Sequence, residues 1–121
     1  MTIHKNQSLV RRFRFAFQGL AAAWRSEANF RIQVTTLLAV VVVLVVVKIE
    51  PIWWALVLLT SGAVLAAELV NTSLEHLADH LHPETHPRIQ IVKDCAAAAV
   101  LVTAGAAVAV GIALIIHLAN R

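Results

Sequence analysis

The feature that most constrains the fold of this 121-residue chain is a series of three long apolar runs. The first run, Ile32 to Val47, carries no charge, and the third is uncharged from Cys95 to Asn120. The second run begins after Pro51 and stays apolar to Ala67. With 60% hydrophobic and 14% charged residues, the chain has too little polar surface to cover these runs in water. We therefore predict an integral membrane protein.

The spanning segments are predicted to be helices, because the bilayer core offers no water to backbone N–H and C=O groups. We place the spans at about residues 31–49, 52–79 and 94–118. Trp53 and Trp54, near the start of the second span, suit the headgroup boundary. The expected fold is an all-α membrane protein with a single domain over residues 1–121.

A further helix is predicted at about residues 8–28, ahead of the first span. Phe13, Phe17, Leu20 and Trp24 recur at steps of three or four residues, with arginines between them. This pattern is typical of an amphipathic helix that lies in the plane of the membrane surface.

The basic residues predict the orientation of the chain. Two of the ten, Lys48 and Arg121, fall on one side of the predicted spans, and eight fall on the other. Because cytoplasmic loops carry the excess of Lys and Arg, we expect the N-terminus and the second loop to be cytoplasmic. The eight residues are Lys5, Arg11, Arg12, Arg14, Arg25, Arg31, Arg88 and Lys93.

Four polar side chains share one face of the second predicted span, in the stretch "LAAELVNTSLEHLADHL". Glu68, Asn71, Glu75 and Asp79 fall within an arc of about 80° and rise over roughly 16 Å along the helix. An unpaired carboxylate at membrane depth is costly, so an acid such as Glu68 predicts a functional site. The alternative is a structural polar seam between packed helices.

The chemistry that suits this face is phosphoryl transfer. Several carboxylates at one interface repel one another unless a hard cation such as Mg²⁺ joins them. Glu27, Lys93 and Asp94 are the other charged candidates near the same membrane boundary. A metal beside an acid that accepts a proton supplies what phosphoryl transfer to a hydroxyl needs. No Walker motif or kinase glycine loop is present in the sequence.

The histidines suggest a second metal site. His76 and His80 lie one helical turn apart, and His82 and His86 follow in the loop. Imidazoles at this spacing can bind a transition metal, but solvated loop histidines are the favoured interpretation because no HEXXH motif is present. His4 and His117 are interpreted as incidental.

At these residues the sequence resembles the prokaryotic diacylglycerol kinase family of small membrane lipid kinases. "AELVNTSLEHLADHL" matches the family pattern Glu-x-x-Asn-Thr/Ser-x-x-Glu-x-x-x-Asp. "KDCAAAAVL" at the start of the third span and "WRSEANFR" before the first support the match. The resemblance covers nearly the whole chain in order and spacing.

The resemblance implies a homotrimeric helical bundle in the bacterial cytoplasmic (inner) membrane, with ATP as phosphoryl donor and Mg²⁺ as cofactor. Glu68 resembles the general base that deprotonates the lipid alcohol, and Asn71 would help to hold the catalytic site together. Glu27 and Glu75 resemble the metal ligands that position the ATP phosphates. The nucleotide-binding positions are matched by Glu27, Glu75, Asp79, Lys93, Asp94 and, at a basic position of the surface helix, Arg11.

Three functions remain open at this point. The resemblance favours phosphorylation of diacylglycerol to phosphatidic acid. The segments "HPETHPRIQIVKD" and "EANFRIQ" are similar to the Gram-positive branch, some of whose members phosphorylate undecaprenol. A non-catalytic membrane assembly protein is the remaining alternative. The expected partners are a lipid substrate, ATP and further copies of the chain, and no nucleic acid is expected.

Overall fold

The computed structural model describes residues 8–121, and within this range the chain forms four helices and no strand. Their bounds are α1 Leu9–Ser26, α2 Ala28–Val47, α3 Pro51–Leu81 and α4 Pro87–Ala119. The last three are long and apolar enough to cross a membrane. The predicted all-α membrane fold, with three spans and a preceding helix, is confirmed. His4 and Lys5 lie outside the described residues.

Local sequence signals set the ends of the helices. The Ser8 hydroxyl accepts a hydrogen bond from the backbone N–H of Arg11 and caps α1, as short polar residues commonly do. Prolines stand in the first turn of α3 and α4, where their missing N–H costs nothing. Lys48, in the left-handed region with φ 52°, ends α2.

The helix α4 begins at Pro87, ahead of the predicted span that starts at residue 94. His86 caps it, because its Nδ1 accepts the backbone N–H of Arg88 at 3.1 Å. The segment "RIQIVKD" is therefore helical rather than part of the loop. As a result Lys93 and Asp94 sit on a rigid element, within reach of the end of α3.

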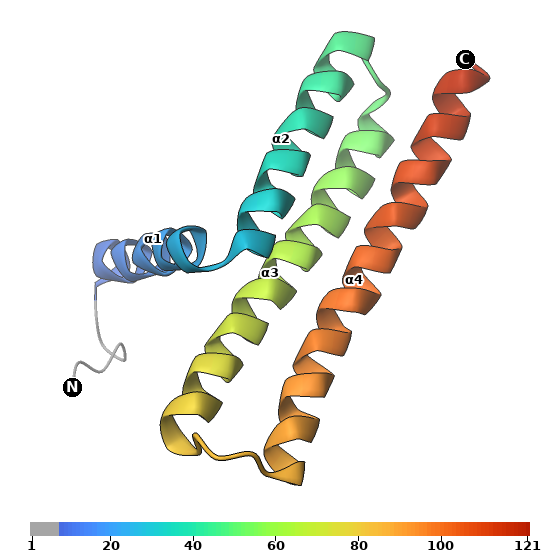
Figure 1. Ribbon diagram of the computed structural model, residues 1–121. Helices are drawn as coiled ribbons and strands as arrows, with labels where there is room; N and C mark the ends of the chain where they lie inside the picture. The colour runs from blue at the N-terminus through green and yellow to red at the C-terminus, as the bar shows by residue number, and fades with distance from the viewer. Residues whose placement is uncertain (1–7) are drawn as a thin grey trace.

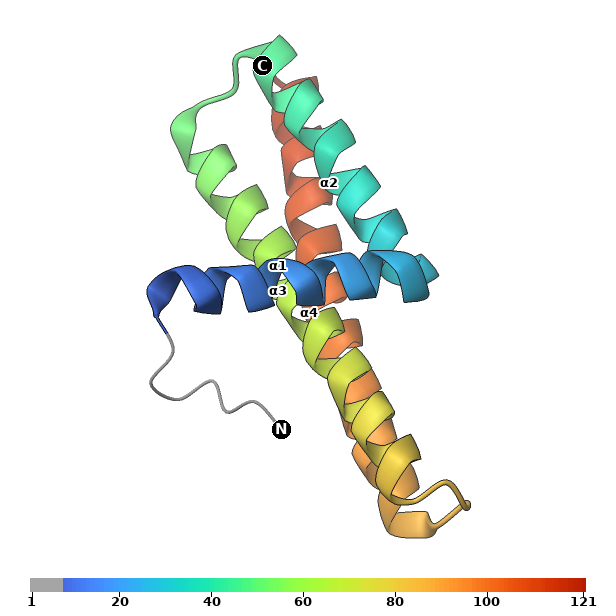
Figure 2. The ribbon, with the colours of Figure 1, turned by 90° about the vertical axis from the view of Figure 1, so that its left-hand side faces the viewer.

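The helices α2, α3 and α4 run alongside one another, and α3 and α4 continue well past the start of α2 (Figure 1). The lengths explain this, since α2 has 20 residues and α3 has 31, a difference of roughly 16 Å at 1.5 Å per residue. The helix α1 lies to one side of the long helices and runs roughly at right angles to them, at the level where α2 begins (Figures 1 and 2). The α3–α4 hairpin therefore projects beyond the level of α1.

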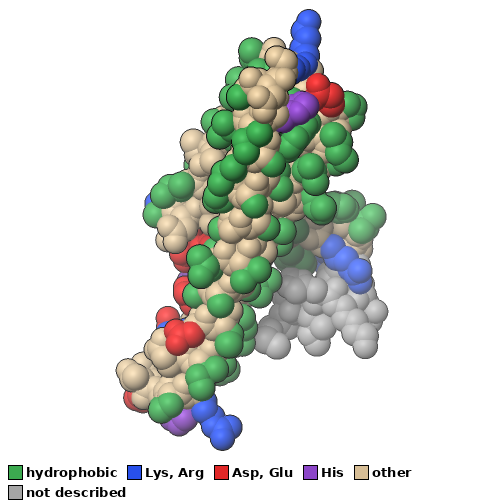
Figure 3. All heavy atoms as spheres, turned by 90° about the vertical axis from the view of Figure 1, so that its right-hand side faces the viewer, with side chains coloured by type: hydrophobic (Ala, Val, Ile, Leu, Met, Phe, Trp, Pro, Cys, Tyr) green, Lys and Arg blue, Asp and Glu red, His purple; other side chains and the backbone are tan. Residues whose placement is uncertain are grey.

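Large apolar side chains remain exposed on all of the long helices. Val46, Leu59 and Leu101 are 72%, 73% and 73% exposed, respectively, and Figure 3 shows hydrophobic side chains over much of the surface. Phe13 and Phe17 are exposed in the same way on α1. Apolar surface of this extent is the signature of contact with lipid or with further helices. The amphipathic helix predicted before the first span is confirmed as α1.

The end of the bundle away from α1 is held by a small apolar core. Leu44 of α2 is fully buried and packs in one cluster with Ile49, Val57 of α3 and Leu114 of α4. The cluster draws on all three long helices and on the loop between α2 and α3. It is therefore the packing contact that holds their ends together.

Polar contacts close the same end of the bundle. The His117 Nε2 atom lies 2.7 Å from Glu50 Oε2, and the Arg121 guanidinium donates to the backbone carbonyls of Val47 and Lys48 at 2.7 and 3.0 Å. The prediction that His117 is incidental is wrong. Its hydrogen bond is the main reason that the pKa of Glu50 lies below its ordinary value of 4.5.

We predict that Leu44→Ala destabilises the protein by about 2 kcal/mol or more, because the cavity lies among three helices. The matched control is Leu38→Ala on the same helix. The Leu38 side chain is 61% exposed, so lipid takes the place of the removed atoms and no cavity forms between the helices. The measurement is unfolding in mixed micelles. Equal destabilisation by the two substitutions would contradict the assigned core.

The Glu50–His117 contact predicts a pH dependence with a definite sign. The folded-state pKa of Glu50 is lowered, so its contribution to stability is full above its ordinary pKa and is lost as pH falls through the lowered value. The effect is small because Glu50 is exposed. We expect the thermal unfolding midpoint to decrease as the pH is lowered through this acidic range. Glu50→Gln should make the midpoint depend less on pH there. An unchanged profile in the variant would refute the contact.

Candidate active site

The acidic face of α3 begins with Glu68, the one buried charged side chain in residues 8–121, which is 4% exposed. Its hydrogen-bond partner in this range is Gln33 of α2, whose Nε2 donates to Glu68 Oε2 at 3.4 Å. Gln33 lies five residues after the start of α2, which is roughly 7–8 Å into that helix. The carboxyl group of Glu68 is therefore held beside the span rather than in open solvent.

One turn further along α3, Asn71 and Glu75 contact each other. The Asn71 Nδ2 atom donates to Glu75 Oε1 at 3.4 Å, an i, i+4 contact on one helix face. The Asn71 Oδ1 and Thr72 Oγ1 atoms are buried without a partner in the described residues. Such atoms are uncommon in native structures and need an explanation. Both atoms lie on α3 between Glu68 and Glu75.

The outer part of the face joins α3 to α4. The Lys93 ammonium group donates to Asp79 Oδ1 across the hairpin, and Gln90 Nε2 donates to Asp94 Oδ1 at 2.9 Å along α4. Lys93 is 32% and Asp79 65% exposed at the side chain, so water screens the pair and its stabilising effect is modest. A phosphate near this pair would meet the ammonium group of Lys93 and the carboxylate of Asp79.

Glu27 lies in the break between α1 and α2. Its backbone ends α1 through an N–H bond to the Ala23 carbonyl, and its side chain caps neither helix. Arg31 ties the same corner together, because its Nη1 donates to the carbonyls of Trp24 and Arg25 at 2.6 and 3.2 Å. The carboxyl group of Glu27 is thus placed where the surface helix meets the bundle, and no hydrogen bond to it is seen within residues 8–121.

The structure brings some of the predicted site residues together and leaves others apart. Asn71 contacts Glu75, and Lys93 contacts Asp79. Arg11 lies in the first turn of α1, far along the chain from these pairs. In residues 8–121 no three His, Cys, Asp or Glu side chains converge to hold a metal ion. Glu27 and Glu75 therefore form no complete metal site within the described part of one chain.

The chemistry of the donor set nevertheless suits Mg²⁺. The Asn71 Oδ1 atom is buried and unpartnered, and the Glu75 carboxylate uses one oxygen for Asn71. Amide and carboxylate oxygens are the hard ligands that Mg²⁺ takes, usually together with phosphate oxygens of a substrate. The oxygen atoms of Asn71 and Glu75 are thus ligands of the type that Mg²⁺ takes, and the ion stays a prediction.

The histidines of the hairpin have structural contacts. His86 caps α4, and its ring lies edge-on to that of His82 with centroids 5.4 Å apart. The His82 Nδ1 atom is 2.8 Å from the Glu84 carbonyl oxygen. These contacts help to shape the loop between α3 and α4, and the transition-metal alternative stays without support in the described residues.

Two residues of the site were missed from the sequence. Gln33 and Thr72 were not singled out, although Gln33 donates to Glu68 and the Thr72 hydroxyl is buried without a partner in the described residues. Thr72 follows Asn71 directly in the motif "ELVNTSLE". Gln33 is the last amide before a run without charges or amides, and that lone polar side chain at the edge of a span was the available signal.

Comparison with known proteins decides the family. The sequence model described as prokaryotic diacylglycerol kinase matches residues 14–115. The chain belongs to the prokaryotic diacylglycerol kinase family. The predicted resemblance is therefore confirmed, and the kinase motif on α3 is the same face that carries Glu68, Asn71 and Glu75.

Curated relatives of the diacylglycerol kinase family carry two names. The chain is 41% identical over 105 residues to the diacylglycerol kinase of Synechocystis sp., covering 86% of this chain and 60% of that protein. It is 32% identical over 103 residues to the undecaprenol kinase of Bacillus subtilis, covering 84% of each. It is 31% identical over 88 residues to the diacylglycerol kinase of Escherichia coli, covering 73% of this chain and 72% of the relative.

Proposed function

We propose that the protein is a lipid kinase that transfers the γ-phosphoryl group of ATP to the hydroxyl group of diacylglycerol, giving phosphatidic acid. The family, and the diacylglycerol kinases among the relatives, support this activity. The chain spans 60% of the Synechocystis protein. The observation within the fold that carries the proposal is a carboxyl group, Glu68, buried at the membrane end of a polar helix face.

Glu68 is the proposed general base. A lipid hydroxyl reaches the protein from within the bilayer, so its base has to stand at that depth. Glu68 takes the proton of the hydroxyl while the hydroxyl oxygen bonds to the γ-phosphorus of ATP. The bond from this phosphorus to the bridging oxygen breaks, and ADP leaves with that oxygen.

The outer residues of the face are proposed to hold the nucleotide. Glu75 and Glu27 would bind Mg²⁺, which when bound neutralises charge on the phosphate oxygens, and Asn71 would orient Glu75 through the contact described above. Lys93 stands beside Asp79 and offers an ammonium group to phosphate. Asp94 and Arg11 complete the proposed nucleotide site.

A homotrimer in the bacterial cytoplasmic membrane is the proposed assembly, with the N-terminus and the α3–α4 hairpin in the cytoplasm. The distribution of basic residues supports this orientation. The extensive exposed apolar surface of α2 and α4 supports association with further helices. A neighbouring copy would supply the ligands that one chain does not bring to Glu75.

Undecaprenol is the second candidate substrate. The Bacillus subtilis undecaprenol kinase aligns over 84% of both chains, a more even coverage than that of the Synechocystis relative. Both lipids present a primary hydroxyl at the headgroup level, so the same base serves either. The non-catalytic alternative, in which the polar face is an assembly seam, predicts no phosphoryl transfer to either lipid.

We predict that the purified protein in lipid, given labelled ATP and Mg²⁺, phosphorylates diacylglycerol faster than undecaprenol. Glu68→Gln keeps the shape of the side chain but removes the proton acceptor, so turnover should fall by about 10²-fold or more. The measurement is labelled lipid product, with the oligomer checked by size-exclusion chromatography.

Faster labelling of undecaprenol would reassign the substrate, and no labelled lipid from the wild-type protein would refute the kinase. Wild-type turnover in Glu68→Gln would remove Glu68 as the base. If Glu68→Gln loses the oligomer but keeps its activity per assembled protein, the result would favour the alternative in which the polar face is an assembly seam.

Glu75→Gln should raise the Mg²⁺ concentration needed for half-maximal activity by about tenfold, because an amide oxygen is a weaker ligand than a carboxylate. The measurement is a Mg²⁺ titration at fixed ATP. Glu84→Gln in the α3–α4 loop, where the side chain is exposed, is the matched control. An unchanged Mg²⁺ dependence in Glu75→Gln would contradict its ligand role.

A further inference from the structure

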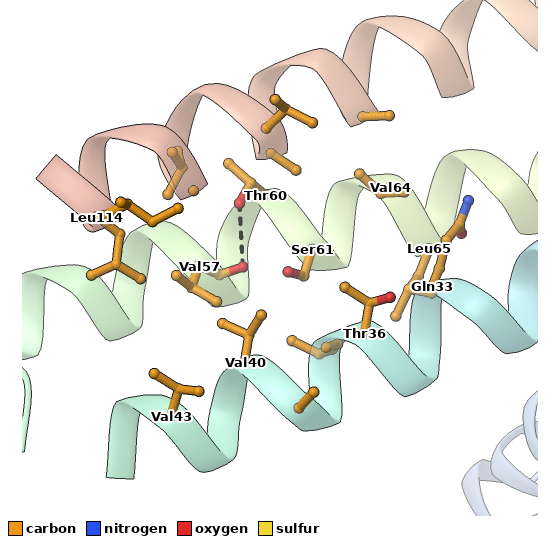
Figure 4. Close-up of a pocket in the computed structure, with 18 of the residues that line it drawn as sticks. Gln33, Thr36, Val40, Val43, Val57, Thr60, Ser61, Val64, Leu65 and Leu114 are labelled. Atoms are coloured by element: carbon orange, nitrogen blue, oxygen red, sulfur yellow. Dashed lines mark hydrogen bonds between the residues drawn. The ribbon is translucent and has the colours of Figure 1, made fainter. Parts of the chain in front are cut away.

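Gln33 is a polar side chain in an apolar setting. It belongs to α2 and reaches toward α3 beside Leu65 (Figure 4). From there it lines the head of a groove of about 610 Å³ between the three long helices, whose other walls are mainly aliphatic. Its Nε2 donates to Glu68 Oε2. An uncharged amide thus stands at the boundary between the apolar groove and the acidic face.

Stability does not account for this amide. The Gln33 Oε1 atom is buried without a partner in residues 8–121, which costs roughly 1–3 kcal/mol. The bond to Glu68 measures 3.4 Å, longer than the usual range of about 2.7–3.2 Å for N–H···O hydrogen bonds. A methionine of similar length would pack between α2 and α3 without burying an unsatisfied oxygen. The amide is therefore better explained by what it does to Glu68.

A carboxylate on a long side chain needs a partner to fix its orientation. The terminal torsion of glutamate is broad, with no sharp staggered minima. A donor on the neighbouring helix selects one orientation and engages one of the two oxygens. Gln33 is that donor in the described residues, and it comes from a different helix, α2.

We propose that Gln33 is a positioning residue for lipid phosphorylation. Its Nε2–H holds Oε2 of Glu68, so that Oε1 faces the hydroxyl group of the lipid. This inference rests on the proposed kinase activity, with Glu68 as the base. Alignment of a reacting pair accounts for large rate factors, and small misplacements cost up to about 10²-fold. Gln33 itself touches neither ATP nor the transferred phosphoryl group.

The test compares three substitutions of Gln33 in the full chain in lipid. Gln33→Met removes the donor at similar size, and Gln33→Asn keeps the amide but is one methylene too short to reach. Both should lower kcat by about 10- to 100-fold. The KM for ATP should stay within about twofold, because the Asp79–Lys93 pair lies roughly 16 Å along α3 from Glu68.

Gln33→Glu is the rescuing variant. Two carboxyl groups at this distance cannot both ionise freely and share a proton, which restores a donor to Glu68. Its kcat should exceed that of Gln33→Met. A merely structural role predicts the reverse order, since methionine suits the apolar surroundings and a second buried acid does not. The control is Thr36→Val, because the Thr36 hydroxyl donates to its own helix at Ile32 O, 2.8 Å away, and its kcat should not change.

Wild-type kcat in Gln33→Met or Gln33→Asn would overturn the inference, and so would a higher kcat in Gln33→Met than in Gln33→Glu. If either Gln33→Met or Gln33→Asn fails to fold, the inference is tested by the kcat per folded protein of the other variant. Wild-type protein that phosphorylates no lipid would overturn the kinase activity instead, and the role of Gln33 with it. A fall in kcat shared by Thr36→Val would assign the loss to packing.

Discussion

The structure depends on the absence of water from the bilayer core. Backbone N–H and C=O groups find no partner there, so each apolar run has to become a helix. The hydrophobic effect does not hold these helices together in lipid, and packing must do so. At one end of the bundle the fully buried Leu44 supplies this packing. The contact between His117 and Glu50 adds a polar interaction at the same end. The other end is left free to carry polar groups.

The unequal lengths of the helices create the site. Because α3 and α4 are 31 and 33 residues long and α2 has 20, the hairpin of α3 and α4 extends past the plane of α1 (Figures 1 and 2). One helix face then passes from lipid depth to water without a break. Glu68 is buried at the inner end and Asp79 is exposed at the outer end. The proposed lipid kinase activity requires an apolar acceptor to meet a charged donor, and this face spans both environments.

Sequence patterns predicted the helices well, because helix formation depends on composition and local signals. The spans, the amphipathic α1 and the family motif from Glu68 to Asp79 all follow from residues close together in the chain. The helix α4 begins at Pro87, ahead of the span predicted at about residues 94–118, because a helix can extend beyond the apolar segment that the span prediction detects. His117 was misjudged, because its partner Glu50 is 67 residues away and only packing brings them together.

The sequence by itself determined that the chain spans a membrane with three helices and carries an acidic face on the second, since periodicity and polarity are properties of each segment alone. Tertiary structure decided which groups meet. It placed Gln33 against Glu68, 35 residues apart, and Lys93 against Asp79 across the hairpin. The physical reason is that hydrogen bonds act over about 3 Å, and the register between packed helices is set by side-chain packing along their whole length.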